Sequence, residues 1–181
     1  MELYETTISS AEKFHGRILN LRVDEITLPN GHTASREVVE HPGGVCVAAV
    51  TGKRELLLVR QFRYPYKEIL TEIPAGKLEP GEDPKSCGER ELLEETGLKA
   101  DSFKEFGRIY PTPGYCDEII YLYLATGLHD VGQRLDEDEF LEIERIPLDD
   151  ALALVLNGKI IDAKTQIAIL KTYYNLSQNN A

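Results

Sequence analysis

Residues 76–98 read GKLEPGEDPKSCGERELLEETGL and contain the clearest helix signal in the chain. Asp83 is a good helix N-cap, Pro84 suits the first helical position, and Gly97 is typical of a C-terminal cap. The glycine and proline residues before Asp83 are typical of a loop. The stretch therefore predicts a loop followed by a helix that ends at Gly97.

Three glutamates gather on one face of this helix. Glu91, Glu94 and Glu95 fall within an arc of roughly 100°, because successive helical residues turn by about 100°. Like charges three or four residues apart destabilise a helix by about 0.2–0.5 kcal/mol per pair, so a neutralising partner is expected. Mg²⁺ prefers carboxylate oxygens together with phosphates and waters, which indicates a divalent metal site. The alternative for these glutamates alone is a solvated acidic face.

Gly88 interrupts the middle of the same helix, where it costs about 1 kcal/mol relative to alanine. Two interpretations stay open at this point. The glycine indicates either close packing against its Cα or a chance substitution.

The spacing of residues 76–98 resembles the signature of the Nudix hydrolases and matches it at every position. The fixed positions are Gly76, Glu82, Arg90, Glu91, Glu94, Glu95 and Gly97, with apolar Leu92 and Leu98. The resemblance implies an α/β/α sandwich that cleaves a diphosphate linked to another moiety.

The resemblance also implies roles for individual residues. Glu91 and Glu95 would bind metal directly, with the main-chain carbonyl of Ala75 as another ligand. Glu94 would be a further ligand or a water-mediated partner with a catalytic role, and Arg90 would pair with Glu82 to hold the loop. Two or three Mg²⁺ ions are implied, with Mn²⁺ as a substitute. Such ions lower the pKa of the attacking water and neutralise charge on the leaving phosphate.

Several further residues resemble the ADP-ribose pyrophosphatase branch of this family. Pro113, followed by Gly114, lies 16 residues past Gly97 and matches the proline that marks the branch, although a Pro-Gly turn explains the pair equally well. Arg63 matches an arginine that binds a phosphate or the terminal ribose. Its alternative is a salt bridge at the rim of the site.

The N-terminal region resembles segments that complete the nucleotide site of a partner subunit. Ile18 resembles an apolar side chain that packs on the adenine, and the segment with Arg36 and Glu37 resembles one that crosses to the partner and touches the nucleotide. An ordinary exposed strand is the alternative for this segment. The resemblance implies a homodimer of two-fold symmetry.

The acidic loop at residues 136–139 resembles the mobile loop that delivers a catalytic glutamate in this branch. Glu139 or Glu137 is the predicted base that orients the attacking water, and the choice between them stays open. A solvated acidic turn is the alternative for each residue.

The pattern along the whole chain predicts an α+β protein with a mixed central sheet covered by helices on both faces. Residues 1–42 predict a small antiparallel β-sheet, which should pack on the rest of the chain or on a second copy. Residues 43–178 predict the hydrolase domain. The expected strands are residues 4–9, 18–28, 37–40, 45–50, 56–62, 69–73, 103–110, 118–125 and 142–146, and the expected C-terminal helices are 149–157 and 162–176.

Composition narrows the possible partners and compartments. The 31 acidic and 20 basic residues leave a net charge of −11, which argues against nucleic acid as a partner. No apolar run of about eighteen residues and no secretory signal occur, so we expect a soluble cytoplasmic protein without a membrane contact. The three cysteines and four histidines show no ligand spacing.

These observations predict Mg²⁺-dependent hydrolysis of ADP-ribose to AMP and ribose 5-phosphate. One alternative is a Nudix hydrolase of another sugar nucleotide, such as ADP-glucose or GDP-mannose. Another is a non-catalytic nucleotide-sensing module, which resembles the hydrolases at the level of the fold.

Overall fold

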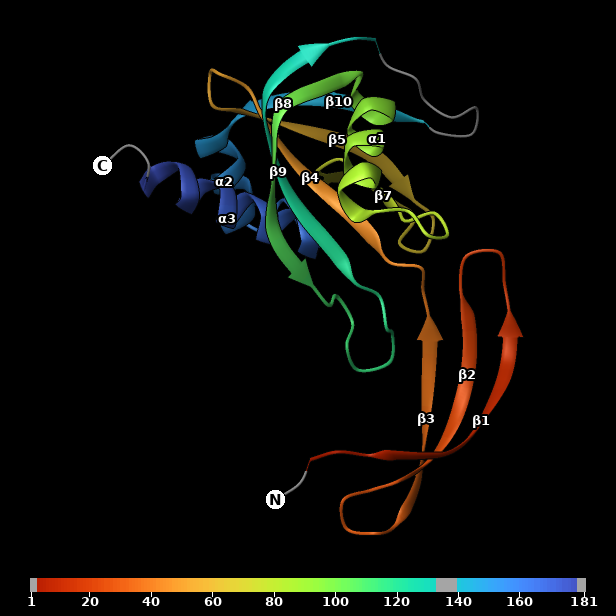
Figure 1. The fold of residues 1–181 in the computed structure, drawn as a ribbon. Helices are drawn as coiled ribbons and strands as arrows, with labels where there is room; N and C mark the ends of the chain where they lie inside the picture. The colour runs from red at the N-terminus through yellow and green to blue at the C-terminus, as the bar shows by residue number, and fades with distance from the viewer. Residues whose placement is uncertain (1–2, 133–139, 179–181) are drawn as a thin grey trace. The chain divides into compact units, whose positions relative to one another are not determined.

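The computed structural model describes residues 3–132 and 140–178, and the chain divides into two compact units (Figure 1). The N-terminal unit comprises Met1–Gly43 together with Tyr110–Ile119. The second unit comprises Gly44–Ile109 and Ile120–Ala181. Residues 110–119 thus group with the N-terminal strands, which their place in the sequence did not predict.

The N-terminal unit is an antiparallel sheet in the order β1-β2-β3. Its strands are β1 (Thr6–His15), β2 (Asn20–Thr27) and β3 (Thr33–Glu40). Strand β1 is longer than the predicted 4–9, because residues 10–15 also pair with β2, as far as His15 opposite Asn20. Every residue of β1 is exposed. The side chains of this outer strand are therefore barely buried by the rest of the unit.

Residues 110–119 attach to the end of β3 through backbone hydrogen bonds. Val39 N donates to the Tyr115 carbonyl at 2.7 Å, and Asp117 N donates to the Val39 carbonyl at 3.1 Å. His41 N donates to Asp117 Oδ1 at 2.8 Å. These bonds explain why a segment far along the chain belongs to this unit.

The second unit is built on a mixed sheet in the order β10-β5-β4-β9-β8, with β6 paired to β5 and β7 paired to β4. The strands are β4 (Gly44–Val50), β5 (Glu55–Arg63), β6 (Glu68–Glu72), β7 (Ala75–Lys77), β8 (Leu98–Ile109), β9 (Ile120–Asp130) and β10 (Leu141–Pro147). Strands β4 and β9 run parallel and the other pairs antiparallel, which makes the sheet mixed as predicted. The short strand β7 was missed by the sequence interpretation.

Helices cover both faces of this sheet (Figure 1). The side chains of β4 alternate between two apolar clusters, because successive residues of a strand point to opposite faces. Cys46, Ala48 and Val50 pack with α2 (Leu148–Leu156) and α3 (Ala163–Gln178). Val45, Val47 and Ala49 share a cluster with side chains of α1 (Pro84–Thr96). The predicted α/β/α sandwich is confirmed.

None of the helices in the described ranges combines the length and apolar character needed to span a membrane.

Helix α1 has the caps that the sequence predicted. The Asp83 side chain accepts a hydrogen bond from Ser86 N at 3.0 Å, and Pro84 begins the helix. Gly97 adopts the left-handed conformation with φ of 72°, and its N–H donates to the Leu93 carbonyl. Both helix ends are therefore determined by local residues, which is why the sequence predicted them.

Gly88 lies in close contact with a pair of aromatic rings. A Cβ at this position would lie 2.9 Å from Phe103 Cζ and 3.4 Å from Tyr123 Cδ2. The two rings pack with their centroids 4.9 Å apart. Of the two interpretations left open above, close packing is the one that the structure supports.

The variant Gly88→Ala is therefore expected to lower the free energy of unfolding by about 1 kcal/mol. Alanine gains about 1 kcal/mol of helix propensity, but crowding a packed core costs about 1–3 kcal/mol. Urea unfolding would measure the difference, with Glu89→Ala on the exposed side of α1 as the control. A stabilised Gly88→Ala protein would contradict the packing argument.

Candidate active site

The candidate site is formed where α1 lies beside β7. Glu91 and Glu95 stand one turn apart on α1, and both are buried, with 8% and 3% of their surfaces exposed. Glu95 Oε2 accepts a hydrogen bond from Ala75 N at 3.0 Å. Two carboxylates are thus placed against the strand that contains Ala75.

Gly76 provides the space for one of these carboxylates. A Cβ on Gly76 would lie 1.8 Å from Glu91 Cδ and 1.9 Å from Glu91 Oε1, closer than atoms can approach. Only glycine therefore leaves room for the Glu91 carboxylate in its present position. This contact gives a physical reason for the first glycine of the motif.

Arg90 pairs with Glu82 through the Nε–Nη2 edge of its guanidinium. Its Nε donates to Glu82 Oε1 at 2.9 Å, and its Nη2 donates to Glu82 Oε2 at 3.0 Å. Glu82 also accepts from Glu79 N at 3.0 Å. Arg90 therefore fixes the loop before α1 to the helix itself.

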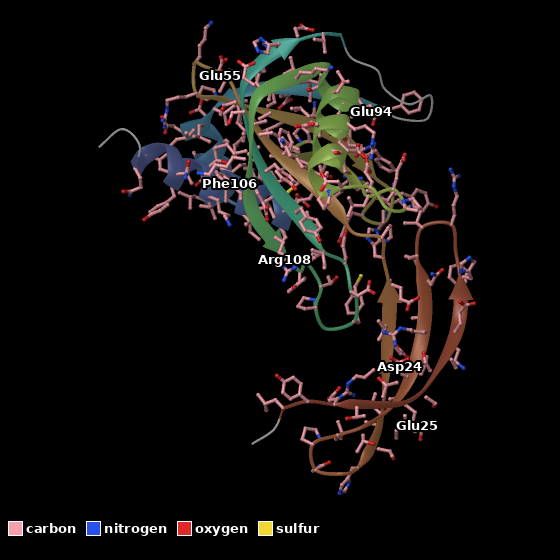
Figure 2. The ribbon with its side chains drawn as sticks, in the orientation of Figure 1. Asp24, Glu25, Glu55, Glu94, Phe106 and Arg108 are labelled. Carbon is pink, nitrogen blue, oxygen red and sulfur yellow. The ribbon has the colours of Figure 1, made fainter. Side chains whose placement is uncertain are left out.

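The same arginine contacts two of the three glutamates on the helix face. Arg90 Nη1 donates to Glu91 Oε1 at 2.9 Å and to Glu94 Oε2 at 2.8 Å. Figure 2 labels Glu94 on α1. One guanidinium thus faces the carboxylates of Glu82, Glu91 and Glu94, and a single positive charge cannot balance three negative ones. The local charge favours a further cation.

The residues present fit a divalent cation by their chemistry. Buried carboxylates are hard oxygen donors of the kind that Mg²⁺ and Mn²⁺ bind, and the missing side chain of Gly76 leaves room for the Glu91 carboxylate. Within residues 3–132 and 140–178, no three His, Cys, Asp or Glu side chains converge as a ready cluster. The structure brings Glu91 and Glu95 to β7, whereas Glu94 is drawn to Arg90.

The Glu82 carboxyl gives the site a measurable pH dependence. The hydrogen bonds from Arg90 lower the pKa of Glu82 from 4.5 to about 2, against a smaller opposing effect of burial. Because the folded pKa lies below the unfolded one, Glu82 stabilises the fold fully above pH 4.5 and loses this contribution as the pH falls toward 2. Urea unfolding across this pH range should show that the free energy of unfolding falls less steeply in Glu82→Gln than in the wild type. Equal slopes for the two proteins would contradict this assignment.

Arg63 lies at the end of β5 and is held by a residue that the sequence interpretation missed. Its Nε donates to Glu72 Oε1 at 2.6 Å and its Nη2 to Glu72 Oε2 at 2.8 Å. Glu95 acts electrostatically on Arg63, so this arginine belongs to the same region as the acidic face of α1. The sequence signal for Glu72 was a glutamate within the expected strand 69–73.

The other predicted substrate-binding residues belong to the N-terminal unit. Ile18 is 53% exposed in the turn between β1 and β2. Arg36 and Glu37 are exposed on β3, and Arg36 forms an ion pair with Glu5. Pro113 and Gly114 lie in the segment that attaches to β3. Their roles in binding stay predictions.

The two candidate bases, Glu137 and Glu139, lie outside the described residues. Their assignment stays a prediction.

Comparison with known proteins identifies the family. Residues 40–165 match the NUDIX domain, and residues 5–39 match the Nucleoside diphosphate sugar hydrolase N-terminal domain. The chain is 44% identical over 169 residues to an ADP-ribose pyrophosphatase of Bacillus subtilis, covering 92% of this chain and 91% of that protein. It is also 44% identical over 167 residues to a methanol dehydrogenase activator of Bacillus methanolicus, covering 91% and 90%.

A solved structure of an ADP compounds hydrolase has the same fold. Its TM-score is 0.87 at 20% sequence identity, covering 99% of this chain and 98% of that one. The signature in residues 76–98, the glutamates of α1 held against β7 and the domain matches agree. The chain belongs to the Nudix family of hydrolases, and it carries the N-terminal domain of the nucleoside diphosphate sugar hydrolases.

Proposed function

We propose that this protein hydrolyses the diphosphate bond of ADP-ribose to give AMP and ribose 5-phosphate, with Mg²⁺ as its metal. The observation that carries the proposal is the pair of buried carboxylates, Glu91 and Glu95, held against β7 beside Gly76. The 44% identity to an ADP-ribose pyrophosphatase supports the choice of substrate.

Nudix hydrolases use divalent metal ions, and different residues of this chain would bind the metal, position the loop and bind the substrate. Glu91, Glu95 and the Ala75 carbonyl would hold the metal, with Glu94 as a further ligand or a water-mediated partner. When bound, two or three Mg²⁺ or Mn²⁺ ions would lower the pKa of the attacking water and neutralise the negative charge on the leaving phosphate. Arg90 keeps the loop in place through Glu82, and Arg63 would bind an anionic oxygen of the substrate. Glu137 or Glu139 would orient the attacking water.

A substrate panel tests the proposal. ADP-ribose, ADP-glucose and GDP-mannose would each be incubated with the purified protein and Mg²⁺ or Mn²⁺. Alkaline phosphatase, which acts on the monoester products and not on the intact diphosphates, would then release inorganic phosphate for detection. ADP-ribose should give the highest kcat/KM, and AMP and ribose 5-phosphate should form in equal amounts. A far higher kcat/KM for another nucleotide would overturn the choice of substrate. Tight calorimetric binding of ADP-ribose without turnover with either metal would instead favour a sensing module.

We also propose that the protein is a homodimer in which the N-terminal unit contributes to the partner's site. Strand β1 is exposed along its length, with Ile8 and Phe14 each more than half exposed. A three-stranded sheet rarely holds alone, and a second copy would cover the exposed strand. Light scattering that shows an active monomer would contradict the dimer.

A further inference from the structure

Glu72 is a buried carboxylate shared by two cations. It ends β6 with 1% of its surface exposed and accepts the two hydrogen bonds from Arg63. Lys164, in the first turn of α3, pairs with the same carboxylate. Lys164 Nζ also lies 3.0 Å from Asp162 Oδ1. Two carboxylates and two cations thus form one group, without net charge, between β5, β6 and the start of α3.

A second contact connects the start of α3 to the same strand. Ile73 N, the residue after Glu72, donates to Thr165 Oγ1 at 3.0 Å. Thr165 N in turn donates to Asp162 Oδ2 at 2.9 Å. Helix α3 therefore holds Glu72 through its side chain and Ile73 through its backbone N–H.

Stability alone gives little reason for this arrangement. Burial would raise the pKa of the Glu72 carboxyl, but the hydrogen bonds and charges of Arg63 and Lys164 outweigh it and hold the pKa below its usual value. A buried ion pair replaced by well-packed apolar residues is often equally stable or more stable. What the charges provide is orientation, because a two-point carboxylate contact fixes the plane of a guanidinium.

The arrangement leaves one edge of Arg63 available. Its Nε and Nη2 face Glu72, whose side chain is 2% exposed, while the arginine side chain is 37% exposed. Burial lowers the pKa of Arg63, but the hydrogen bonds to Glu72 outweigh this effect and raise it above its usual value, so the charge is permanent. A fixed, partly exposed cation that also interacts electrostatically with Glu95 suits an anionic phosphate oxygen.

We propose that Glu72, supported by Lys164, is a positioning residue that fixes the guanidinium of Arg63 for an anionic oxygen of the diphosphate substrate. This inference rests on the proposed function, and it adds Glu72 and Lys164 as determinants of substrate binding. Both act through Arg63 and touch no reacting atom.

A double-mutant cycle tests the inference through steady-state kinetics with ADP-ribose. Glu72→Gln breaks the two-point contact, since one amide oxygen is left to accept, and should raise KM roughly tenfold with kcat within about threefold. Arg63→Gln should raise KM at least as much. The double variant should match Arg63→Gln within about twofold, because the inference has Glu72 act on the substrate through Arg63 alone. Glu142→Gln, which removes the exposed pair between Glu142 and Arg60 on neighbouring strands, is the matched control and should leave KM unchanged.

Multiplied effects in the double variant would overturn the inference, because a merely structural Glu72 would act independently of Arg63. If Glu72→Gln does not fold, Glu72→Asp and Lys164→Met replace it in the same cycle. Each should raise KM in the wild-type background and leave KM unchanged in the Arg63→Gln background. Calorimetric titration with a non-cleavable methylene analogue of ADP-ribose should show Kd rising in parallel with KM.

The experiment separates this inference from the proposed function. If the wild type hydrolyses another sugar nucleotide and not ADP-ribose, the proposed substrate fails, and the cycle run with that nucleotide decides the role of Glu72. If the wild type hydrolyses none of these nucleotides, calorimetric titration with inorganic diphosphate and Mg²⁺ replaces the kinetics. The coupling between Glu72 and Arg63 is then measured from the Kd values of the same variants. Equal Kd values for the wild type and Glu72→Gln would overturn the inference.

Discussion

Glu91→Gln and Glu95→Gln are each expected to lower kcat by about a thousandfold or more while the protein stays folded. Losing one carboxylate of the metal site removes roughly 4 kcal/mol of transition-state stabilisation, which corresponds to that factor. Glutamine keeps the shape of the side chain, and its carbonyl oxygen can still accept from Arg90 or from Ala75 N. Steady-state assays and circular dichroism would separate lost chemistry from lost structure.

The matched control is Glu89→Gln on the same helix. Glu89 is exposed and pairs only loosely with Lys85, at 3.6 Å, so its loss should leave kcat within about twofold. Calorimetric titration with Mn²⁺ should show weaker binding in Glu91→Gln and Glu95→Gln and no change in Glu89→Gln. Full turnover in either of the first two variants would refute the metal assignment.

Gly76→Ala is expected to lower kcat about a hundredfold with little change in stability. The new methyl group would overlap the Glu91 carboxylate, which must then move away from β7. Because that carboxylate is the end of a flexible side chain, the fold should lose only about 1 kcal/mol. A catalytic group displaced by about 1 Å can lose two orders of magnitude in rate.

Gly52→Ala tests whether any new methyl group would have the same effect. Gly52 lies in the turn between β4 and β5, and a Cβ there would meet nothing within 4 Å. Its kcat should equal that of the wild type. A Gly76→Ala protein with wild-type kcat would show that the position of Glu91 against Gly76 is not required for turnover.

The two predictions depend on different kinds of information. Glu91 and Glu95 were found from the sequence, because residues one turn apart on a capped helix share a face whatever the rest of the chain does. The reason for Gly76 was not visible in the sequence. It depends on the pairing of β7 with β4 and on the position of α1 beside that strand, which no local pattern contains.

Strand ends and partners show the same limit. The sequence located most strands of the second unit, because apolar runs such as 45–50 mark a sheet buried on both faces. It underestimated β1, whose second half is held by its pairing with β2. It also did not place residues 110–119 with β3, because those hydrogen bonds join segments about 75 residues apart.

The sequence by itself determined the family, helix α1 with its caps and the stripe of glutamates on it, because these depend on interactions within a few residues. Only the tertiary structure decided the contact of the Glu91 carboxylate with Gly76, the placing of Arg90 between Glu91 and Glu94, and the group of Glu72, Arg63 and Lys164. Glu72 and Lys164 are 92 positions apart in the chain. Their charges meet only after β6 has joined the sheet and α3 has packed against it, so no local rule could have paired them.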